Sequence, residues 1–219
     1  MGQQIRLAVN EIREGMAIPF RLLSRYADLL IAPFLFEVTL LVAYLVARIA
    51  SMCVPLALGG LARKAGPQLA VLFQMPKQAP FQAAAARVNL GYLMVCGAVS
   101  LLVLGCAPFI AGALGGLNHA FDEIVIWLVV GQAAPVLFGA TALLMHAVDR
   151  GAFYVVLQGM TATMFIGGVV VLDNTNAVVV AQTLAAAQLT QAALCALLLT
   201  QCGVWPGLTA LFHKEIKLF

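Results

Sequence analysis

Six apolar stretches, each long enough to cross a lipid bilayer, dominate this sequence. Of its 219 residues 63% are hydrophobic and 10% are charged, and the mean hydropathy is +1.01. A helix needs about 20 apolar residues to span the hydrocarbon layer, and such a composition leaves too few polar side chains to cover a water-soluble domain. We therefore predict an all-α integral membrane protein with six transmembrane helices. The predicted spans are approximately 16–36, 37–62, 88–113, 123–147, 152–172 and 177–202.

The positive charges predict how these helices are oriented. Eleven of the twelve Lys and Arg residues lie near the N-terminus, in the connection 63–87, at Arg150 or in the C-terminal tail. The other three connections contain acidic residues and no Lys or Arg. Since basic residues concentrate on the cytoplasmic side, both termini are predicted to be cytoplasmic. Residues 1–15 and 204–219 are then interfacial segments that flank a membrane domain over 16–203.

The connection 63–87, between the second and third predicted spans, is predicted to be cytoplasmic. It contains Pro67, Pro76 and Pro80 together with four basic residues. The apolar run at 69–73 is too short to cross a bilayer, and we expect it to lie at the interface.

Asp28 and Arg48 are charges placed well inside the apolar zone. A charge at that depth costs roughly 3 kcal/mol on insertion scales, so it normally has a partner in the protein interior. Asp28 and Arg48 lie at similar depths in the first two predicted helices, so their side chains can pair with each other. In the alternative, Asp28 pairs with Arg25 one turn away on its own helix, and Arg48 binds a carbonyl or another helix.

Polar residues within the apolar stretches are the candidates for lining a cavity. Tyr44, Arg48, Ser51 and Pro55 are spaced to share one helix face, which either lines a cavity or only contacts the first helix. Glutamines of the last span are predicted to hydrogen-bond between helices, with a hydrated path as the alternative. The full candidate set is Arg25, Asp28, Tyr44, Arg48, Ser51, Gln132, Gln188 and Gln191.

Prolines and small residues mark predicted bends and close helix contacts. Pro55 and Pro135 should each bend their helix, because proline cannot donate the backbone hydrogen bond. Glycines and threonine repeated every fourth residue allow neighbouring helices to approach closely in a membrane. The predicted hinge and packing residues are Pro55, Gly131, Pro135, Gly139, Gly159, Thr163 and Gly167.

Motifs for catalysis and for metal or nucleotide binding are missing. There is no Gly-x-Ser-x-Gly, HExxH, CxxC or Walker sequence. The histidines are scattered, and none of the five cysteines has a second cysteine or a histidine at ligand spacing. Basic residues are not interleaved with aromatic ones. We therefore expect no enzyme activity, no metal, no cofactor and no nucleic-acid partner.

Three segments resemble the C-terminal lobe of polysaccharide and O-antigen flippases, in the multidrug/oligosaccharidyl-lipid/polysaccharide exporter superfamily. Residues 25–50 are similar to the opening of that lobe, with Asp28, Tyr44 and Arg48 at matching positions. Residues 66–88 resemble an inner loop of the lobe, with Pro67 and Arg87 matching. Residues 107–132 resemble the outer turn and the following helix, with Gly115, Gly116 and Glu123 matching.

The resemblance implies a six-helix lobe that moves a lipid-linked glycan across a bacterial inner membrane by alternating access. Members of the family have twelve or more spans, so the chain is expected to need a second lobe, either a second copy or a missing N-terminal half. Arg48 and Arg25 are the expected contacts for acidic substrate groups. A membrane interaction protein that does not transport, using the glycine faces of the fourth and fifth predicted helices, and a multidrug or cation antiporter remain as alternatives.

Overall fold

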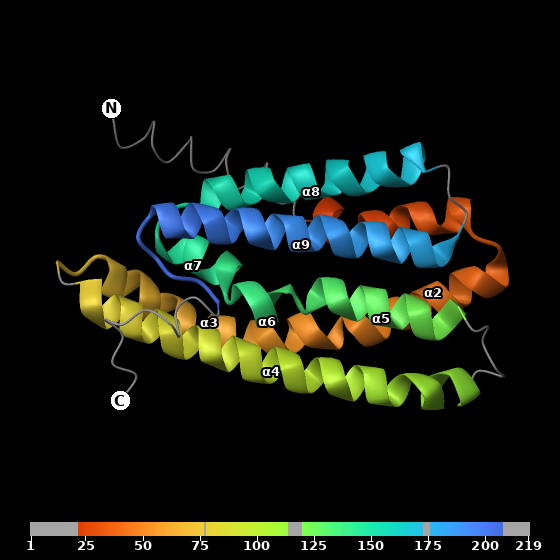
Figure 1. Cartoon of the computed structure of the whole chain (residues 1–219), viewed down its shortest axis with the longest axis horizontal. Helices are drawn as coiled ribbons and strands as arrows, with labels where there is room; N and C mark the ends of the chain where they lie inside the picture. The colour runs from red at the N-terminus through yellow and green to blue at the C-terminus, as the bar shows by residue number, and fades with distance from the viewer. Residues whose placement is uncertain (1–21, 77, 114–119, 173–175, 208–219) are drawn as a thin grey trace.

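The computed structural model describes residues 22–76, 78–113, 120–172 and 176–207, and these segments are helical without a strand (Figure 1). The first helical residues described are 22–35. The helices that follow are α2 (Val38–Ser51), α3 (Cys53–Phe73), α4 (Gln78–Ala113), α5 (Ala120–Gln132), α6 (Ala134–Phe138), α7 (Thr141–Ala147), α8 (Gly151–Val171) and α9 (Ala177–Gln201). The predicted segment 1–15, Gly115, Gly116 and the tail beyond residue 207 lie outside the described residues.

Five helical segments are long and apolar enough to cross a membrane. They are Val38–Phe73, Gln78–Ala113, Ala120–Phe138, Gly151–Val171 and Ala177–Gln201. Large apolar side chains on their outer surfaces are exposed, among them Leu101 at 73% and Val171 at 83%. Such surfaces suit lipid rather than water, so the chain is a multi-pass membrane protein. The first predicted span, 16–36, lies partly outside the described residues.

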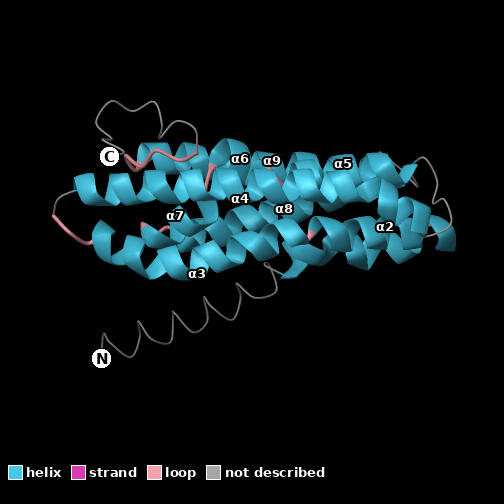
Figure 2. Ribbon diagram, turned by 90° about the horizontal axis from the view of Figure 1, so that it is seen from below, coloured by secondary structure: helices cyan, strands magenta, loops and turns pink. Residues whose placement is uncertain are grey.

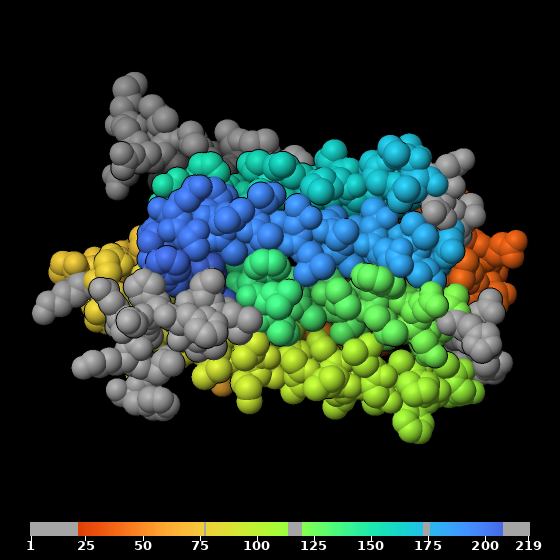
Figure 3. Space-filling view, in the orientation of Figure 1, coloured from red at the N-terminus to blue at the C-terminus, as the bar shows by residue number. Residues whose placement is uncertain are grey.

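The helices form an elongated bundle. In Figure 1 and in the space-filling view of Figure 3, α8, α9, α5 and α4 lie side by side across one face. The view in Figure 2 shows α2 and α3 along the opposite side. α3 ends and α4 begins at one end of the bundle, whereas α8 ends and α9 begins at the other (Figure 1).

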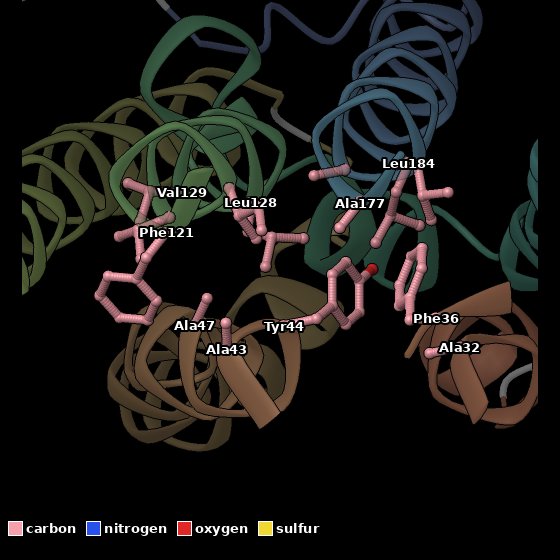
Figure 4. Close-up of a cluster of buried hydrophobic side chains, with 14 of the residues drawn as sticks. Ala32, Phe36, Ala43, Tyr44, Ala47, Phe121, Leu128, Val129, Ala177 and Leu184 are labelled. Atoms are coloured by element: carbon pink, nitrogen blue, oxygen red, sulfur yellow. The ribbon is translucent and has the colours of Figure 1, made fainter. Parts of the chain in front are cut away.

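A core of small and aromatic side chains joins the first helical segment to α2, α5 and α9. Figure 4 shows Tyr44 beside Phe36, and their ring centroids are 5.3 Å apart. Ala43 and Ala47 on α2 are both buried in the same cluster. Alanines at these positions allow the helix backbones to approach closely, and small residues are typical of helix contacts in membranes.

The bounds predicted for the second and third helices at residues 62 and 88 were wrong, because most of the connection 63–87 is helical. α3 continues to Phe73 and α4 begins at Gln78, so the break between them is short. Pro67 lies inside α3, and Pro80 lies in the first turn of α4, where a missing N–H is tolerated. Buried Leu69 and Phe81 pack with residues of α7 and α9, and this apolar contact keeps both segments helical despite their prolines and charges.

The predicted fourth helix, 123–147, is divided into α5, α6 and α7. The first interruption is at Ala133, just before Pro135. The second is at Gly139, which has φ 70° and ψ −159°, a conformation open essentially only to glycine. The predicted helix is therefore broken twice, and the first break falls two residues before Pro135. A bend was also predicted at Pro55. The helix is interrupted three residues earlier, at Met52, which is the only residue between α2 and α3.

Candidate functional site

Asp28 and Arg48 form a buried ion pair between the first helical segment and α2. Arg48 Nε lies 2.7 Å from Asp28 Oδ2, and both side chains are at most 1% exposed. Tyr44, one turn before Arg48, donates its hydroxyl hydrogen to Asp28 Oδ2 at 3.1 Å. The predicted pairing between the two helices is thus confirmed. The carboxylate and the guanidinium stabilise each other in a region where either alone would be costly.

Arg25 contributes its backbone rather than its charge to this pair. Arg48 Nη2 donates a hydrogen bond to the carbonyl oxygen of Arg25 at 2.7 Å. The Arg25 guanidinium lies 5.7 Å from the centre of the Tyr26 ring, an arrangement typical of a cation–π contact. The alternative pairing of Asp28 with Arg25 is not the one observed.

A cavity of about 460 Å³ lies within the bundle, bounded by residues of every helix described. Its size is within the range of small-molecule sites in proteins, about 300–1,000 Å³. Of the predicted cavity residues, Arg25, Arg48, Gln132, Gln188 and Gln191 line it. Asp28, Tyr44 and Ser51 do not. Asp28 and Tyr44 hold Arg48 from behind, and Ser51 Oγ donates to the carbonyl oxygen of Arg48 at 2.8 Å.

The charged residues on the cavity wall all carry positive charge. Arg25 and Arg48 line the cavity, and no Asp or Glu is among its described lining residues. The ion pair does not use all of the Arg48 guanidinium, because Nη1 has no hydrogen-bond partner among the described groups. A buried donor without a partner costs about 1–3 kcal/mol, and more when it is charged. One nitrogen of a guanidinium on the cavity wall is therefore left without a partner among the described groups, while Asp28 holds the other side of the same guanidinium.

Four glutamines from three helices form another part of the wall. They are Gln132 on α5, Gln158 on α8, and Gln188 and Gln191 on α9. Gln132 Nε2 donates to Gln188 Oε1 at 3.4 Å, and Thr161 Oγ1 on α8 donates to Gln191 Oε1 at 3.1 Å. The predicted hydrogen bonding between helices is confirmed. The same residues also face the cavity, which agrees with the alternative of a polar path.

Gly131 allows α5 and α9 to approach closely. A Cβ atom at this position would lie 2.9 Å from the Ala185 Cα and 2.5 Å from Gln188 Oε1. The close contact predicted for Gly131 is therefore present, and it brings Gln132 and Gln188 within hydrogen-bond distance. Any larger residue would push apart the wall that carries the glutamines.

At Gly139 the backbone passes close against the segment that follows α9, and we call this contact the crossing. A Cβ atom on Gly139 would lie 2.4 Å from the backbone nitrogen of Gly207, and one on Gly207 would meet the carbonyl oxygen of Leu137. Asn89 on α4 fixes this crossing. It accepts a hydrogen bond from the Ala140 N–H at 2.9 Å and donates to the carbonyl oxygen of Trp205 at 3.3 Å.

Two of the small residues predicted on α8 do not face another helix within the part of the chain that the structure describes. Thr163 and Gly167 are exposed, and a Cβ atom on Gly167 would meet no described atom within 4 Å. Gly168 is the close contact instead, with Thr183 Cγ2 of α9 only 2.7 Å from the position of its missing Cβ. Gly159 is partly buried.

Sequence reasoning missed Asn89, Gln158, Tyr92 and Tyr154. The last three line the cavity, and Asn89 holds the broken helix against the residues after α9. Asn89 and Gln158 are each a polar residue within an apolar stretch. The same pattern identified the predicted cavity residues, so it could have identified these two as well.

The chain was compared with protein-family models, with curated proteins and with solved structures, and none of the three comparisons finds a match.

Proposed function

We propose that this protein is one lobe of a membrane exporter that moves a lipid-linked glycan across the bacterial inner membrane by alternating access. One observation carries the proposal: the buried guanidinium of Arg48, with Nη1 unpartnered among the described groups, lines a cavity that has no acidic residue in its described wall. Guanidinium binds phosphate and carboxylate through paired N–H donors. Arg48, assisted by Arg25, binds the acidic group of the substrate.

The proposal includes six transmembrane helices with both termini in the cytoplasm, and a second lobe that completes the pathway. That lobe is a second copy or a separate N-terminal half. The broken helix α5–α6–α7 supports transport, because discontinuous helices beside a cavity are typical of secondary transporters. The position of Asp28 argues against a cation antiporter, because Asp28 is not among the described residues that line the cavity.

A docking protein without transport is the second candidate, and one observation favours it. Thr163 and Gly167 lie exposed on α8, so this face has room for a helix of another chain. The glycine face of α5 is not available for such docking, because Ala185 and Gln188 of α9 occupy the space beside Gly131.

The test of transport separates the charge of Arg48 from its contribution to folding. The variant Arg48→Gln paired with Asp28→Asn removes both charges and keeps side chains of similar size, so neither buried charge is left alone. In cells that lack the natural chain, we expect this double variant to reach the membrane at normal levels and to export no glycan. Arg63→Gln is the control, since Arg63 is exposed and does not line the cavity. Normal export by the double variant would remove Arg48 from the mechanism.

The topology is tested with single cysteines in a background without the five natural ones. A cysteine at Gln74 should react with a membrane-impermeant maleimide only after the cytoplasm is opened, whereas one at Asn176 should react in intact cells. These positions belong to connections at opposite ends of the bundle (Figure 1). The reverse pattern would overturn the proposed orientation and the assignment to the exporter superfamily.

The second lobe is tested by native mass measurement in lipid nanodiscs. A dimer of this chain, or a complex with a second polytopic chain, supports transport. A stable complex with an unrelated membrane enzyme, disrupted by Gly167→Leu, supports the docking function instead.

A further inference from the structure

Two basic residues on the outer surface of α3 and α4 lie apart from the cavity. Lys64 on α3 and Arg87 on α4 are exposed, and neither is among the described residues that line the cavity. The one ion pair among the described residues joins Asp28 to Arg48, and the sequence 63–89 contains no Asp or Glu. The two cations can therefore accept an anion from outside the chain.

A contact between α3 and α4 places these cations at one level. A Cβ atom on Gly91 of α4 would lie 3.9 Å from Leu61 Cδ1 of α3, in ordinary van der Waals contact. Lys64 comes three residues after Leu61, and Arg87 comes four residues before Gly91. Both steps lead toward the end of the bundle where α3 ends and α4 begins (Figure 1), so the depths of the two cations differ by about 1.5 Å. Residues three or four apart share a helix face, and both cations, being exposed, lie on the outer side of the contact.

Arg63, the neighbour of Lys64, lies on another side of α3. A helix turns about 100° per residue, so Arg63 is directed about 160° away from Leu61, whereas Lys64 is only about 60° away. Arg150, at the start of α8, lies over the ring of Phe153 at 5.4 Å from its centre. These two arginines are cations outside the surface formed by Lys64 and Arg87.

The surroundings of Arg87 match the boundary between lipid head groups and hydrocarbon. Trp205, a residue type enriched at membrane interfaces, accepts a hydrogen bond at its carbonyl oxygen from Asn89, two residues from Arg87. Leu90 and Met94, three and seven residues after Arg87, share its helix face and are 41% and 66% exposed. A charged level followed by an apolar surface matches a phospholipid, with its phosphate at the cations and its acyl chains beyond them.

Gly60 leaves open space beside Lys64. It lies one turn before Lys64 on the exposed face of α3, and a Cβ atom there would meet no described atom within 4 Å. A lipid head group can therefore approach the α3 backbone closely. The axes of packed helices lie about 8–10 Å apart, so the long side chains of a lysine and an arginine, one from each helix, can reach a single phosphate between them.

We propose that Lys64 and Arg87 bind the phosphate of one anionic phospholipid, whose acyl chains lie along Leu90 and Met94. A zwitterionic lipid also carries a cationic group, which these residues repel, so the surface selects lipids with a net negative charge. The inference does not depend on the proposed transport. The proposed orientation serves only to assign the lipid to the cytoplasmic leaflet.

Native mass spectrometry of the full chain in detergent micelles measures this binding, with phosphatidylglycerol and phosphatidylcholine of the same acyl chains as probes. We expect one phosphatidylglycerol per chain, bound at least about tenfold more tightly than phosphatidylcholine, as two basic residues near one anionic head group predict. Equal affinity for the two lipids would overturn the proposal. Glycerol 3-phosphate should compete weakly, because it has no acyl chains, and displacement at equal concentrations would assign the surface to a soluble phosphate instead.

Paired variants test the two cations. Lys64→Gln with Arg87→Gln should lower the affinity for phosphatidylglycerol at least about tenfold and leave the affinity for phosphatidylcholine unchanged. Arg63→Gln with Arg150→Gln removes the same number of charges and should change neither affinity. An equal loss in both double variants would mean that net charge alone attracts the lipid, and the site would be overturned.

Gly60→Leu tests the position of the lipid without a change of charge. The new side chain occupies the open surface beside Lys64, so the affinity for phosphatidylglycerol should fall about fivefold, the equivalent of one lost contact. Gly167→Leu is the matched control, since Gly167 on α8 is also exposed and has no described atom within 4 Å of a Cβ. Elution in size-exclusion chromatography checks that both variants fold. Unchanged affinity in folded Gly60→Leu would contradict the placement of the phosphate.

Discussion

Asn89 on α4 accepts a hydrogen bond from the backbone N–H of Ala140, over 2.9 Å, at the second break of the discontinuous helix. The same side chain donates to the carbonyl oxygen of Trp205. One buried amide thus joins α4, the start of α7 and the segment that follows α9. An interruption within a membrane helix leaves backbone groups without helical partners, and Asn89 satisfies one of them.

We expect Asn89→Leu to destabilise the protein by about 1–3 kcal/mol, because a buried N–H and a carbonyl oxygen lose their partner. The measurement is the free energy of unfolding in a detergent titration. Thr163→Val is the control, since Thr163 is exposed and, among the described groups, donates its hydroxyl to the carbonyl oxygen of Gly159 in its own helix. A loss no larger than that of the control would show that water or another group replaces Asn89.

The glycines after Phe138 and in the segment following α9 should differ in their tolerance of alanine. Gly203 has φ 74° but no described atom within 4 Å of a Cβ, so Gly203→Ala should cost about 1–2 kcal/mol through backbone strain alone. Gly139→Ala and Gly207→Ala add collisions with backbone atoms. We therefore expect both to lower the thermal unfolding midpoint more than Gly203→Ala does. Equal midpoints for all three variants would mean that the backbones at Gly139 and Gly207 can move apart without loss of stability.

Gly131→Ala should weaken the contact between α5 and α9. Its Cβ would lie 2.9 Å from Ala185 Cα, and overpacking of this kind typically costs about 1–3 kcal/mol. Gly105→Ala in α4 is the matched control, because a Cβ there meets no described atom within 4 Å. Thermal unfolding in lipid nanodiscs should separate the two variants, with Gly131→Ala alone destabilised. Similar stability would show that α9 shifts to accept the methyl group.

The energy that couples Asp28 to Arg48 is measurable by a double-mutant cycle. Each single replacement by alanine leaves a buried charge without its partner, which typically costs about 3–5 kcal/mol. We expect Asp28→Ala with Arg48→Ala to cost clearly less than the sum of the single variants, because no charge remains unpaired. The free energies of unfolding of all four proteins give the coupling. Additive losses would mean that the pair contributes only through packing.

The residues that sequence alone placed correctly are those for which the apolar surroundings leave few physical solutions. Asp28 and Arg48 needed partners in the apolar zone, and depth along two successive helices left few choices. Pro135 had to interrupt its helix, because it lacks the N–H that a continuous helix requires. The bonds of Gln188 and Gln191 to other helices follow from the cost of an unsatisfied amide away from water.

The features that sequence missed depend on contacts between distant segments. Residues 63–87 contain prolines and charges that indicate a loop, yet the burial of Leu69 and Phe81 against α7 and α9 keeps them helical. No local pattern predicts that Gly139 meets Gly207, since the two lie far apart in the chain. The cavity itself was expected only as one wall of a larger pathway, because a helix pattern does not reveal how much space its neighbours leave.

The combined length of α2 and α3 exceeds the thickness of the hydrocarbon layer. Together they cover 36 residues, Val38–Phe73, which extend about 54 Å at 1.5 Å per residue, whereas the hydrocarbon core is about 30 Å thick. The end of α3 is nevertheless no loose extension, because Leu69 packs with residues of α7 and α9. The excess length therefore belongs to the packed bundle.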